Sequence, residues 1–269
     1  MPPYFIPALV ACCLIGFGVH AAEPSSGCGR DPPAAPPVQF DVAGQPSRAI
    51  VVPPPGYRAS RPYPLVFAFH GRTNSAAQVR GYFGLEVAAL PAILVYPAGR
   101  QEASGRFTWS DPGIALFDTL LERLAARYCV DRAAVFVVGH SLGASFANSL
   151  ACARADRIRG VASVAGGIDG AHCAGTVAAL LLHNPLDKAV PVTEGLRARS
   201  ALLGRRPAVG SPLALEGGFA CAQDRAGADP LLWCLHHESL NRRGRFYPHQ
   251  WPTDAGATIM AFFADLPRQ

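Results

Sequence analysis

The stretch VFVVGHSLGASFANSL, residues 135–150, decides the fold. Its first four residues are all apolar, which is typical of a strand covered on both faces of a sheet, and a helical pattern follows over 141–154. Gly139 and Gly143 flank Ser141, and the turn between such a strand and helix is too tight for other side chains at the two glycine positions. The stretch predicts a strained elbow that holds the Ser141 hydroxyl above the sheet edge. The alternative is an ordinary glycine-containing turn.

The remaining patterns alternate between strands and helices. Short apolar runs bounded by proline and glycine predict strands over 49–52, 64–70, 92–96, 134–138, 160–164, 177–183 and 231–236. Apolar residues at helical spacing predict helices over 114–128, 141–154, 192–203 and 258–265. Asp111 and Pro112 are expected to cap the first of these helices. We therefore expect an α/β-hydrolase fold, with a mostly parallel central sheet, helices on both faces and no lid domain.

Composition and the N-terminal sequence indicate an exported single-domain protein. Half of the 269 residues are hydrophobic, and the basic residues behind the net charge of +5 are scattered, which argues against a nucleic-acid partner. The apolar run in residues 1–22 predicts a signal peptide, too short to span a membrane, cleaved near Ala21 or Ala22. A proline-rich arm over 23–48 and a catalytic domain over 49–269 follow. Residues 9–12 also resemble a lipoprotein box, which would anchor the chain at Cys12.

The cysteine count predicts disulfide bonds. Of eight cysteines, Cys12 and Cys13 belong to the leader, and an even set in an exported chain favours disulfides. No pair has the Cys-x-x-Cys spacing of a zinc site, so we expect no metal. The remaining six are Cys28, Cys129, Cys152, Cys173, Cys221 and Cys234.

A serine becomes a nucleophile when a neutral imidazole, oriented by a carboxylate, accepts its proton. In this fold the chain order is serine, acid, histidine. Asp187 follows the predicted strand 177–183 and is the expected acid, while His249, on a loop before the last helix, is the expected base. The weaker alternatives for the acid are Asp169, Asp224 and Asp229, and those for the base are His236 and His237.

The oxyanion hole of such a site needs two backbone donors. The first is expected from Leu142, directly after the nucleophile. The second is expected from Arg72 or Thr73, because the predicted strand 64–70 ends in His70-Gly71 and glycine lets the backbone approach a substrate. The sequence does not choose between these two residues.

Several motifs together resemble the secreted esterases of the feruloyl esterase and polyhydroxybutyrate depolymerase-like group, carbohydrate esterase family 1. The resemblance runs from about Ser26 to Phe263 and implies a single-domain esterase without cofactor, with Ser141, Asp187 and His249 as its triad. The motifs that carry it are GCG at 27–29, FHG at 69–71, YCVD at 128–131, GHSLG at 139–143, HNPLDKAVP at 183–191 and HQWP at 249–252.

The resemblance also has implications for the disulfides, and the chain departs from the family in places. The Cys of the first motif and the Cys before the elbow strand occur together in the family, and this resemblance implies the pair Cys28–Cys129. Proximity in sequence pairs Cys152 with Cys173 and Cys221 with Cys234. The family often has glycine where this chain has Ala144 and Asn184, and a glycine-rich segment in place of 245–248. These departures are expected to reshape the substrate pocket.

The resemblance implies an enzyme that releases hydroxycinnamic acids from plant cell-wall polysaccharide. We expect this enzyme to be a monomer. Trp109, Tyr247 and Trp251 are expected to stack on the aromatic acyl group, the alternative being that Trp251 only packs under the histidine loop. A polyhydroxyalkanoate depolymerase or an acetylxylan esterase would use the same triad. A catalytically silent binding protein is the non-enzymatic alternative, and the complete set of triad residues argues against it.

Overall fold

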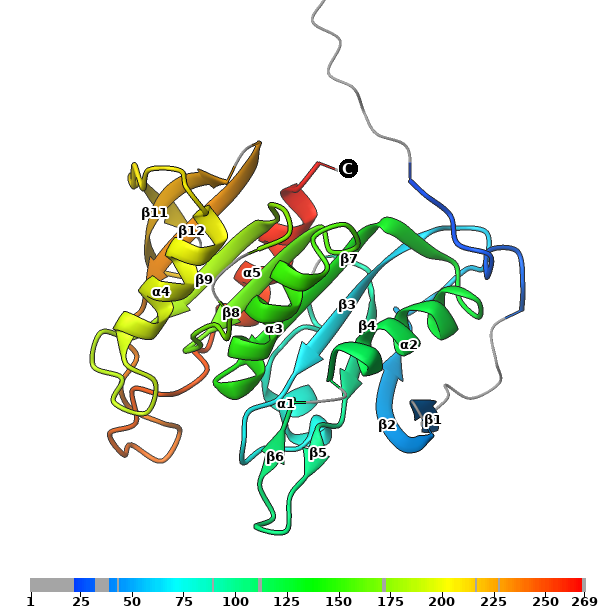
Figure 1. The fold of residues 1–269 in the computed structure, drawn as a ribbon, viewed down its shortest axis with the longest axis horizontal. Helices are drawn as coiled ribbons and strands as arrows, with labels where there is room; N and C mark the ends of the chain where they lie inside the picture. The colour runs from blue at the N-terminus through cyan, green and yellow to red at the C-terminus, as the bar shows by residue number, and fades with distance from the viewer. Residues whose placement is uncertain are drawn as a thin grey trace, which may run out of the picture.

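The computed structural model describes residues 22–31, 39–42, 44–88, 90–110, 113–170, 173–215, 217–226 and 228–267. Ten strands form one sheet in the order β1-β2-β4-β3-β7-β8-β9-β12-β11-β10 (Figure 1). They are β1 (Gln39–Val42), β2 (Gln45–Val52), β3 (Tyr63–Phe69), β4 (Ile93–Pro97), β7 (Val130–His140), β8 (Gly160–Val164), β9 (Ala178–His183), β10 (Ser211–Leu215), β11 (Phe219–Ala226) and β12 (Asp229–Leu235). A separate small hairpin pairs β5 (Arg100–Gln101) with β6 (Phe107–Thr108).

The centre of the sheet is parallel and its two edges are antiparallel. Strands β4, β3, β7, β8, β9 and β12 run in the same direction. The β1-β2-β4 edge and the β12-β11-β10 edge are antiparallel. Every residue of β4, β8 and β9 is buried, which explains why nearly all of their residues are apolar. The predicted mostly parallel sheet is confirmed.

Helices cover both faces of this sheet, as predicted (Figure 1). One face packs against α2 (Gly113–Ala125), α3 (Leu142–Ala153) and α4 (Val192–Leu203), whose apolar residues share one core cluster with the strands. The opposite face packs against α1 (Ala76–Tyr82) and α5 (Ala255–Asp265), which belong to a second cluster. The resulting three layers are those of an α/β-hydrolase, and the carboxyl ends of the parallel strands meet at one edge.

The elements that the sequence analysis missed are short or lie at the edge of the sheet. Helix α1 has seven residues, and its signal was the Ser75-to-Gln78 capping box, in which each side chain accepts a hydrogen bond from the other residue's backbone N–H. Strand β10 is largely exposed and so lacks an apolar pattern. The expected cap of α2, Asp111 with Pro112, lies outside the described residues.

The start of the arm is bound to the sheet end next to β7. The Ser25 hydroxyl donates to the Tyr128 carbonyl at 2.8 Å and accepts the Val130 N–H at 3.0 Å. The structure has three disulfide bonds, Cys28–Cys129, Cys152–Cys173 and Cys221–Cys234. These are the pairs expected from the family resemblance and from proximity in sequence. The predicted leader, apart from Ala22, and the lipoprotein site at Cys12 lie outside the described residues.

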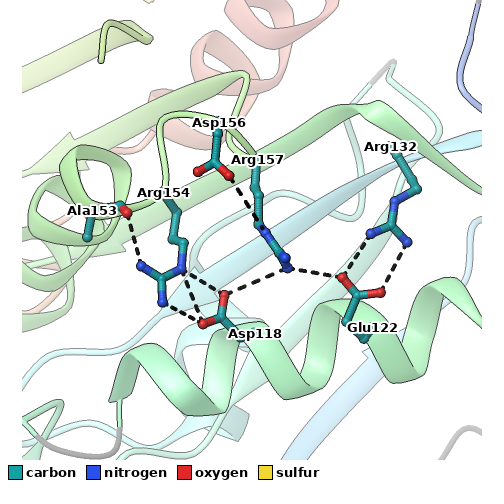
Figure 2. Close-up of polar contacts among 7 residues, drawn as sticks. All are labelled: Asp118, Glu122, Arg132, Ala153, Arg154, Asp156 and Arg157. Carbon is teal, nitrogen blue, oxygen red and sulfur yellow. Dashed lines mark hydrogen bonds and ion pairs between the residues drawn. The ribbon is translucent and has the colours of Figure 1, made fainter. Parts of the chain in front are cut away.

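An ion-pair network ties α2 to the start of β7 and to the turn after α3 (Figure 2). Arg154 donates to Asp118 at 2.7 Å, and Arg132 and Arg157 donate to Glu122 at 2.8 and 3.0 Å. Each side chain is about one-third to one-half exposed, so each pair stabilises the fold by only about 0 to 1 kcal/mol. The network joins the outer surfaces of α2 and the turn after α3 near the start of β7, at the end of that strand opposite to Ser141.

Across the described ranges, none of the helices is long and apolar enough to cross a lipid bilayer.

Candidate active site

The elbow between β7 and α3 has the strained geometry that its sequence predicts. Ser141 has φ 58° and ψ −123°, a left-handed conformation that costs energy for a residue with a side chain. A Cβ on Gly143 would overlap the Phe69 carbonyl of β3, and a Cβ on Gly139 would overlap the Gly143 carbonyl. The two glycines therefore let the elbow pack against β3 while the Ser141 N–H donates to the Val164 carbonyl at 2.9 Å.

Three side chains from distant parts of the sequence meet at this elbow. The His249 ring is hydrogen-bonded through Nδ1 to Asp187 Oδ2 at 2.6 Å and through Nε2 to Ser141 Oγ at 2.8 Å. Because a carboxylate only accepts, Nδ1 carries the proton, and Nε2 is left to accept the serine hydroxyl. This arrangement can remove a proton from Ser141 and return it to a leaving group.

The acid is held ionised in a buried loop. Burial alone raises the pKa of Asp187, but hydrogen bonds from His249 and from the backbone N–H groups of Val190 and Ala189 outweigh it and lower that pKa below its usual range. The carboxylate thus stays charged at neutral pH. A charged acceptor on Nδ1 keeps His249 in the tautomer that can act as a base.

Two further residues shape the acid loop. His183 Nε2 donates to the Val190 carbonyl at 2.8 Å, which closes the loop around Asp187. The Asn184 side-chain amide donates to the Glu238 carbonyl at 3.0 Å and to the Ser239 hydroxyl at 3.2 Å. Asn184, one of the departures from the family pattern, therefore connects the acid loop to the segment that leads to His249.

Among the residues that the structure describes, none of the alternative acids and bases is hydrogen-bonded to the Ser141 hydroxyl or to His249. Asp224 pairs with Arg199, and Asp229 pairs with Arg159 and accepts the Thr176 hydroxyl. The Asp169 backbone is hydrogen-bonded to Ser149. His236 is buried, and neither of its ring nitrogens has a hydrogen-bond partner among the residues that the structure describes.

The loop after β3 brings backbone groups next to Ser141. A Cβ on Gly71 would lie 3.4 Å from Ser141 Cβ, so the backbone at this glycine borders the nucleophile. His70 orders the loop, since its Nδ1 donates to the Gly71 carbonyl at 2.8 Å and its Nε2 accepts the Gly99 N–H at 2.9 Å. His70 lies at the end of a predicted strand, but no local pattern in the sequence indicates this role, because it depends on Gly99 nearly 30 residues away.

The three expected substrate-binding aromatic residues differ in exposure. Trp109 is 4 % exposed, stacks on Phe146, and donates its indole N–H to the His70 carbonyl at 2.8 Å. Trp251 is 8 % exposed and stacks on Phe83 with ring centroids 3.8 Å apart. Tyr247 is 46 % exposed, with its ring 6.0 Å from that of His249. Tyr247 is thus the one of the three with a substantially open side chain.

Buried histidines make the stability of this region depend on pH. Burial, with a contribution from His249, lowers the pKa of His140 to about 3, and burial with neighbouring His183 lowers that of His236 to about 4. The unfolded chain titrates at about 6.5, so below that pH it binds protons that the folded protein excludes. The free energy of unfolding should therefore fall as the pH drops from about 6.5 to about 4.

Between pH 7 and 4.5 the free energy of unfolding of His236→Leu should fall by about 2 kcal/mol less than that of the parent. The reason is that the variant lacks one group that takes up a proton in the unfolded state. Urea unfolding at the two pH values measures it. An equal fall in the free energy of unfolding of parent and variant would contradict the role of His236 in the pH dependence of stability.

Comparisons with known proteins find relatives along most of the chain. Residues 42–189, more than half of the chain, match the family described as "Putative esterase", a segment that includes Ser141 and Asp187. Feruloyl esterase D of Neurospora crassa is 30 % identical over 243 residues, covering 81 % of this chain and 82 % of that protein. Feruloyl esterase C of Emericella nidulans is 30 % identical over 222 residues, covering 76 % and 80 %.

Solved structures of other esterases have the same fold. An acetyl xylan esterase from Aspergillus awamori superposes with a TM-score of 0.63 at 14 % identity, covering 81 % of this chain and 94 % of that one. A Bacillus cereus carboxylesterase superposes with a TM-score of 0.57 at 14 % identity, covering 82 % and 94 %. At such low identity the likeness concerns the fold alone.

Proposed function

The chain belongs to this esterase family and is related to the fungal feruloyl esterases, and on that premise we propose that it hydrolyses carboxylic esters through Ser141, Asp187 and His249. The observation that carries the proposal is the continuous hydrogen-bonded chain from Asp187 through His249 to the Ser141 hydroxyl. In this fold, ester hydrolysis uses such a series of hydrogen bonds at a strained elbow and requires no cofactor.

The reaction follows from these positions. Ser141 Oγ attacks the ester carbonyl carbon while His249 Nε2 takes the hydroxyl proton. The oxyanion accepts hydrogen bonds from the Leu142 N–H, at the N-terminus of α3, and from the N–H of Arg72 or Thr73. As the carbonyl re-forms, the bond to the alcohol breaks and His249 gives its proton to the leaving oxygen. Water then attacks the acyl-serine by the same route in reverse and releases the acid.

We propose a hydroxycinnamoyl ester of a plant cell-wall polysaccharide as the substrate. The names of the two relatives that match at 30 % identity support it, as both are feruloyl esterases. Trp109 lines two cavities, of about 520 and 480 Å³, and Phe146 also lines the smaller one. We propose that Trp109 contributes an aromatic surface for the acyl group. Tyr247 and Trp251 are proposed to contact the substrate from the loop that carries His249.

The three disulfides support export into an oxidising compartment. We accordingly propose residues 1–22 as a signal peptide and 23–48 as an arm that is linked to the catalytic domain, 49–269, by the disulfide bond of Cys28.

Relative rates on three substrates test the proposed chemistry. We expect methyl ferulate to be hydrolysed with a higher kcat/KM than p-nitrophenyl acetate, because stacking adds about 0.5 to 1.5 kcal/mol per good aromatic contact. A polyhydroxybutyrate suspension should not be cleared. Clearing of the polyester without release of ferulate would reject the proposed substrate in favour of the depolymerase alternative.

A further inference from the structure

A short hairpin stands directly before the catalytic histidine. Residues 239–247, which we call the arginine hairpin, follow β12 and form the dark orange loop that projects from the sheet at the same end as the β5–β6 hairpin (Figure 1). Leu240 bridges to Phe246, and the Tyr247 N–H donates to the Ser239 carbonyl at 2.7 Å. The Asn241 side-chain oxygen accepts the N–H groups of Arg243 and Arg245 at 3.0 and 3.1 Å. The hairpin is therefore ordered by its own backbone.

The hairpin carries positive charge that the protein itself does not neutralise. Arg242, Arg243 and Arg245 are exposed, and their guanidinium groups have no hydrogen bond or ion pair to any residue in the described part of the chain. The neighbouring acid is Glu238, whose carboxylate accepts the N–H and hydroxyl of Thr253 at 3.1 to 3.2 Å. The three arginine charges thus exceed the single charge of Glu238, whose carboxylate is already hydrogen-bonded to Thr253. The surface of the hairpin is therefore positive and attracts anions.

The hairpin is held at a fixed place relative to the triad. Asn184 binds its base through the Glu238 carbonyl and the Ser239 hydroxyl, and Asn184 belongs to the loop that carries Asp187. At its other end Tyr247 is separated from His249 by one proline. Two departures from the family pattern, Asn184 and the segment 245–248, thus meet in one structural unit.

A cavity of about 630 Å³ is lined by this hairpin and by the loop after β3. Its lining includes Arg242, Arg243 and Tyr247 of the hairpin, Glu238 directly before the hairpin, and Thr73 of the loop after β3. The wall also contains Trp251, which is more than nine-tenths buried and whose indole N–H has no partner among the described residues. Guanidinium groups only donate, and the Glu238 carboxylate in the wall is already engaged by Thr253, so the arginine side of this cavity favours a ligand with acceptor oxygens.

The chemistry of the triad assigns this cavity to the alcohol side of the ester. His249 Nε2 must protonate the departing oxygen, so the leaving alcohol lies against the loop that carries His249. Tyr247 and Trp251 belong to that loop and line the cavity. In the proposed function the leaving alcohol is a sugar, so the sugar residues next to the ester reach the arginine hairpin.

From these contacts we infer that the arginine hairpin and its cavity bind a carboxylate-bearing sugar, a uronic acid, on the polysaccharide that carries the ester. The inference rests on the proposed function for its connection to catalysis. Arg242 and Arg243 pair with the carboxylate, while the exposed faces of Leu240 and Tyr247 pack on a sugar ring. The substrate class is thereby narrowed to hydroxycinnamoylated acidic polysaccharides.

Binding to the Ser141→Ala protein tests the inference without hydrolysis. The probes are a xylo-oligosaccharide substituted with glucuronic acid and a neutral xylo-oligosaccharide of the same length, measured by calorimetry at low salt. We expect the acidic probe to bind about five- to tenfold more tightly, and this preference to shrink at high salt. Adding Arg242→Gln and Arg243→Gln should abolish the preference.

The matched control is Arg205→Gln with Arg206→Gln, an adjacent pair of exposed arginines after α4 that does not line the cavity. It should keep the preference. The inference would be overturned if the Ser141→Ala protein bound the two probes equally well. It would also be overturned if both double variants lost the preference for the acidic probe to the same extent.

A kinetic readout separates this inference from the proposed function. In the protein with Ser141 intact, Arg242→Gln with Arg243→Gln should raise KM for feruloylated acidic oligosaccharide and leave kcat/KM for neutral methyl ferulate within about twofold. Loss on both substrates alike would count against a carboxylate site. If the parent releases no ferulate from any ester but still binds the acidic probe through this arginine pair, the proposed function fails and the inference holds.

Discussion

Replacing Ser141 with alanine is expected to lower kcat for methyl ferulate by about 10⁴-fold or more, with a folded protein and little change in KM. In the proposed mechanism the Ser141 hydroxyl oxygen forms the covalent bond to the acyl group, and alanine offers no nucleophile in its place. The oxyanion donors and binding contacts remain, so the residual rate should exceed that of the uncatalysed reaction. Steady-state kinetics on both proteins measure the effect.

The control for this experiment is Ser149→Ala. Ser149 lies further along α3, and its hydroxyl donates to the backbone carbonyls of Ser145 and Asp169 rather than contacting His249. We expect it to retain activity within a few-fold of the parent. Activity of Ser141→Ala within tenfold of the parent would remove Ser141 from the reaction.

Removing the Cys28–Cys129 disulfide is expected to cause the largest loss of stability from a single crosslink. Its cysteines are separated by 101 positions, and closing so long a loop stabilises a fold by roughly 4 to 5 kcal/mol in the chain-entropy model. The bond also fastens the arm to the start of β7. Urea unfolding of a Cys28→Ser, Cys129→Ser variant without reducing agent measures the loss.

The matched variant is Cys221→Ser with Cys234→Ser, whose cysteines are separated by only 13 positions across the β11–β12 pair. The shorter loop predicts a smaller loss, roughly 3 kcal/mol. Equal losses in the two variants would contradict the loop-length argument, and an unchanged unfolding free energy in the first would contradict the pairing.

The centre of the fold could be predicted because its residues follow strict patterns. Strands β8 and β9 are apolar at every position but one or two and are buried on both faces, and the expected range 192–203 coincides with α4. The elbow could be predicted equally well, because close contacts with the neighbouring backbone and with β3 require glycine at positions 139 and 143.

The periphery could not be predicted, because its structure depends on contacts between distant residues. Strands β10 and β11 extend the sheet by antiparallel pairing, and half-exposed strands carry a weak periodic signal. The roles of His70 and Asn184 are likewise set by partners far along the chain, Gly99 and the pair Glu238 and Ser239. No local pattern indicates such partners.

The aromatic residues show why residue type alone is insufficient to assign a binding role. Trp109 and Trp251 are each largely buried against a phenylalanine, and Trp109 also uses its indole N–H within the fold. Tyr247 differs because the hairpin places it at the protein surface beside His249. Its exposure follows from the turn at residues 241–245, which the sequence pattern does not specify.

Covalent labelling of Ser141 tests the central claim most directly. An organophosphate ester such as diethyl p-nitrophenyl phosphate transfers its phosphoryl group to a serine that is activated by a neighbouring imidazole. Peptide mass spectrometry should find one label per chain, on Ser141, and release of ferulate should fall in proportion to the labelled fraction. A label on a different residue, or full labelling of Ser141 with undiminished ferulate release, would contradict the account.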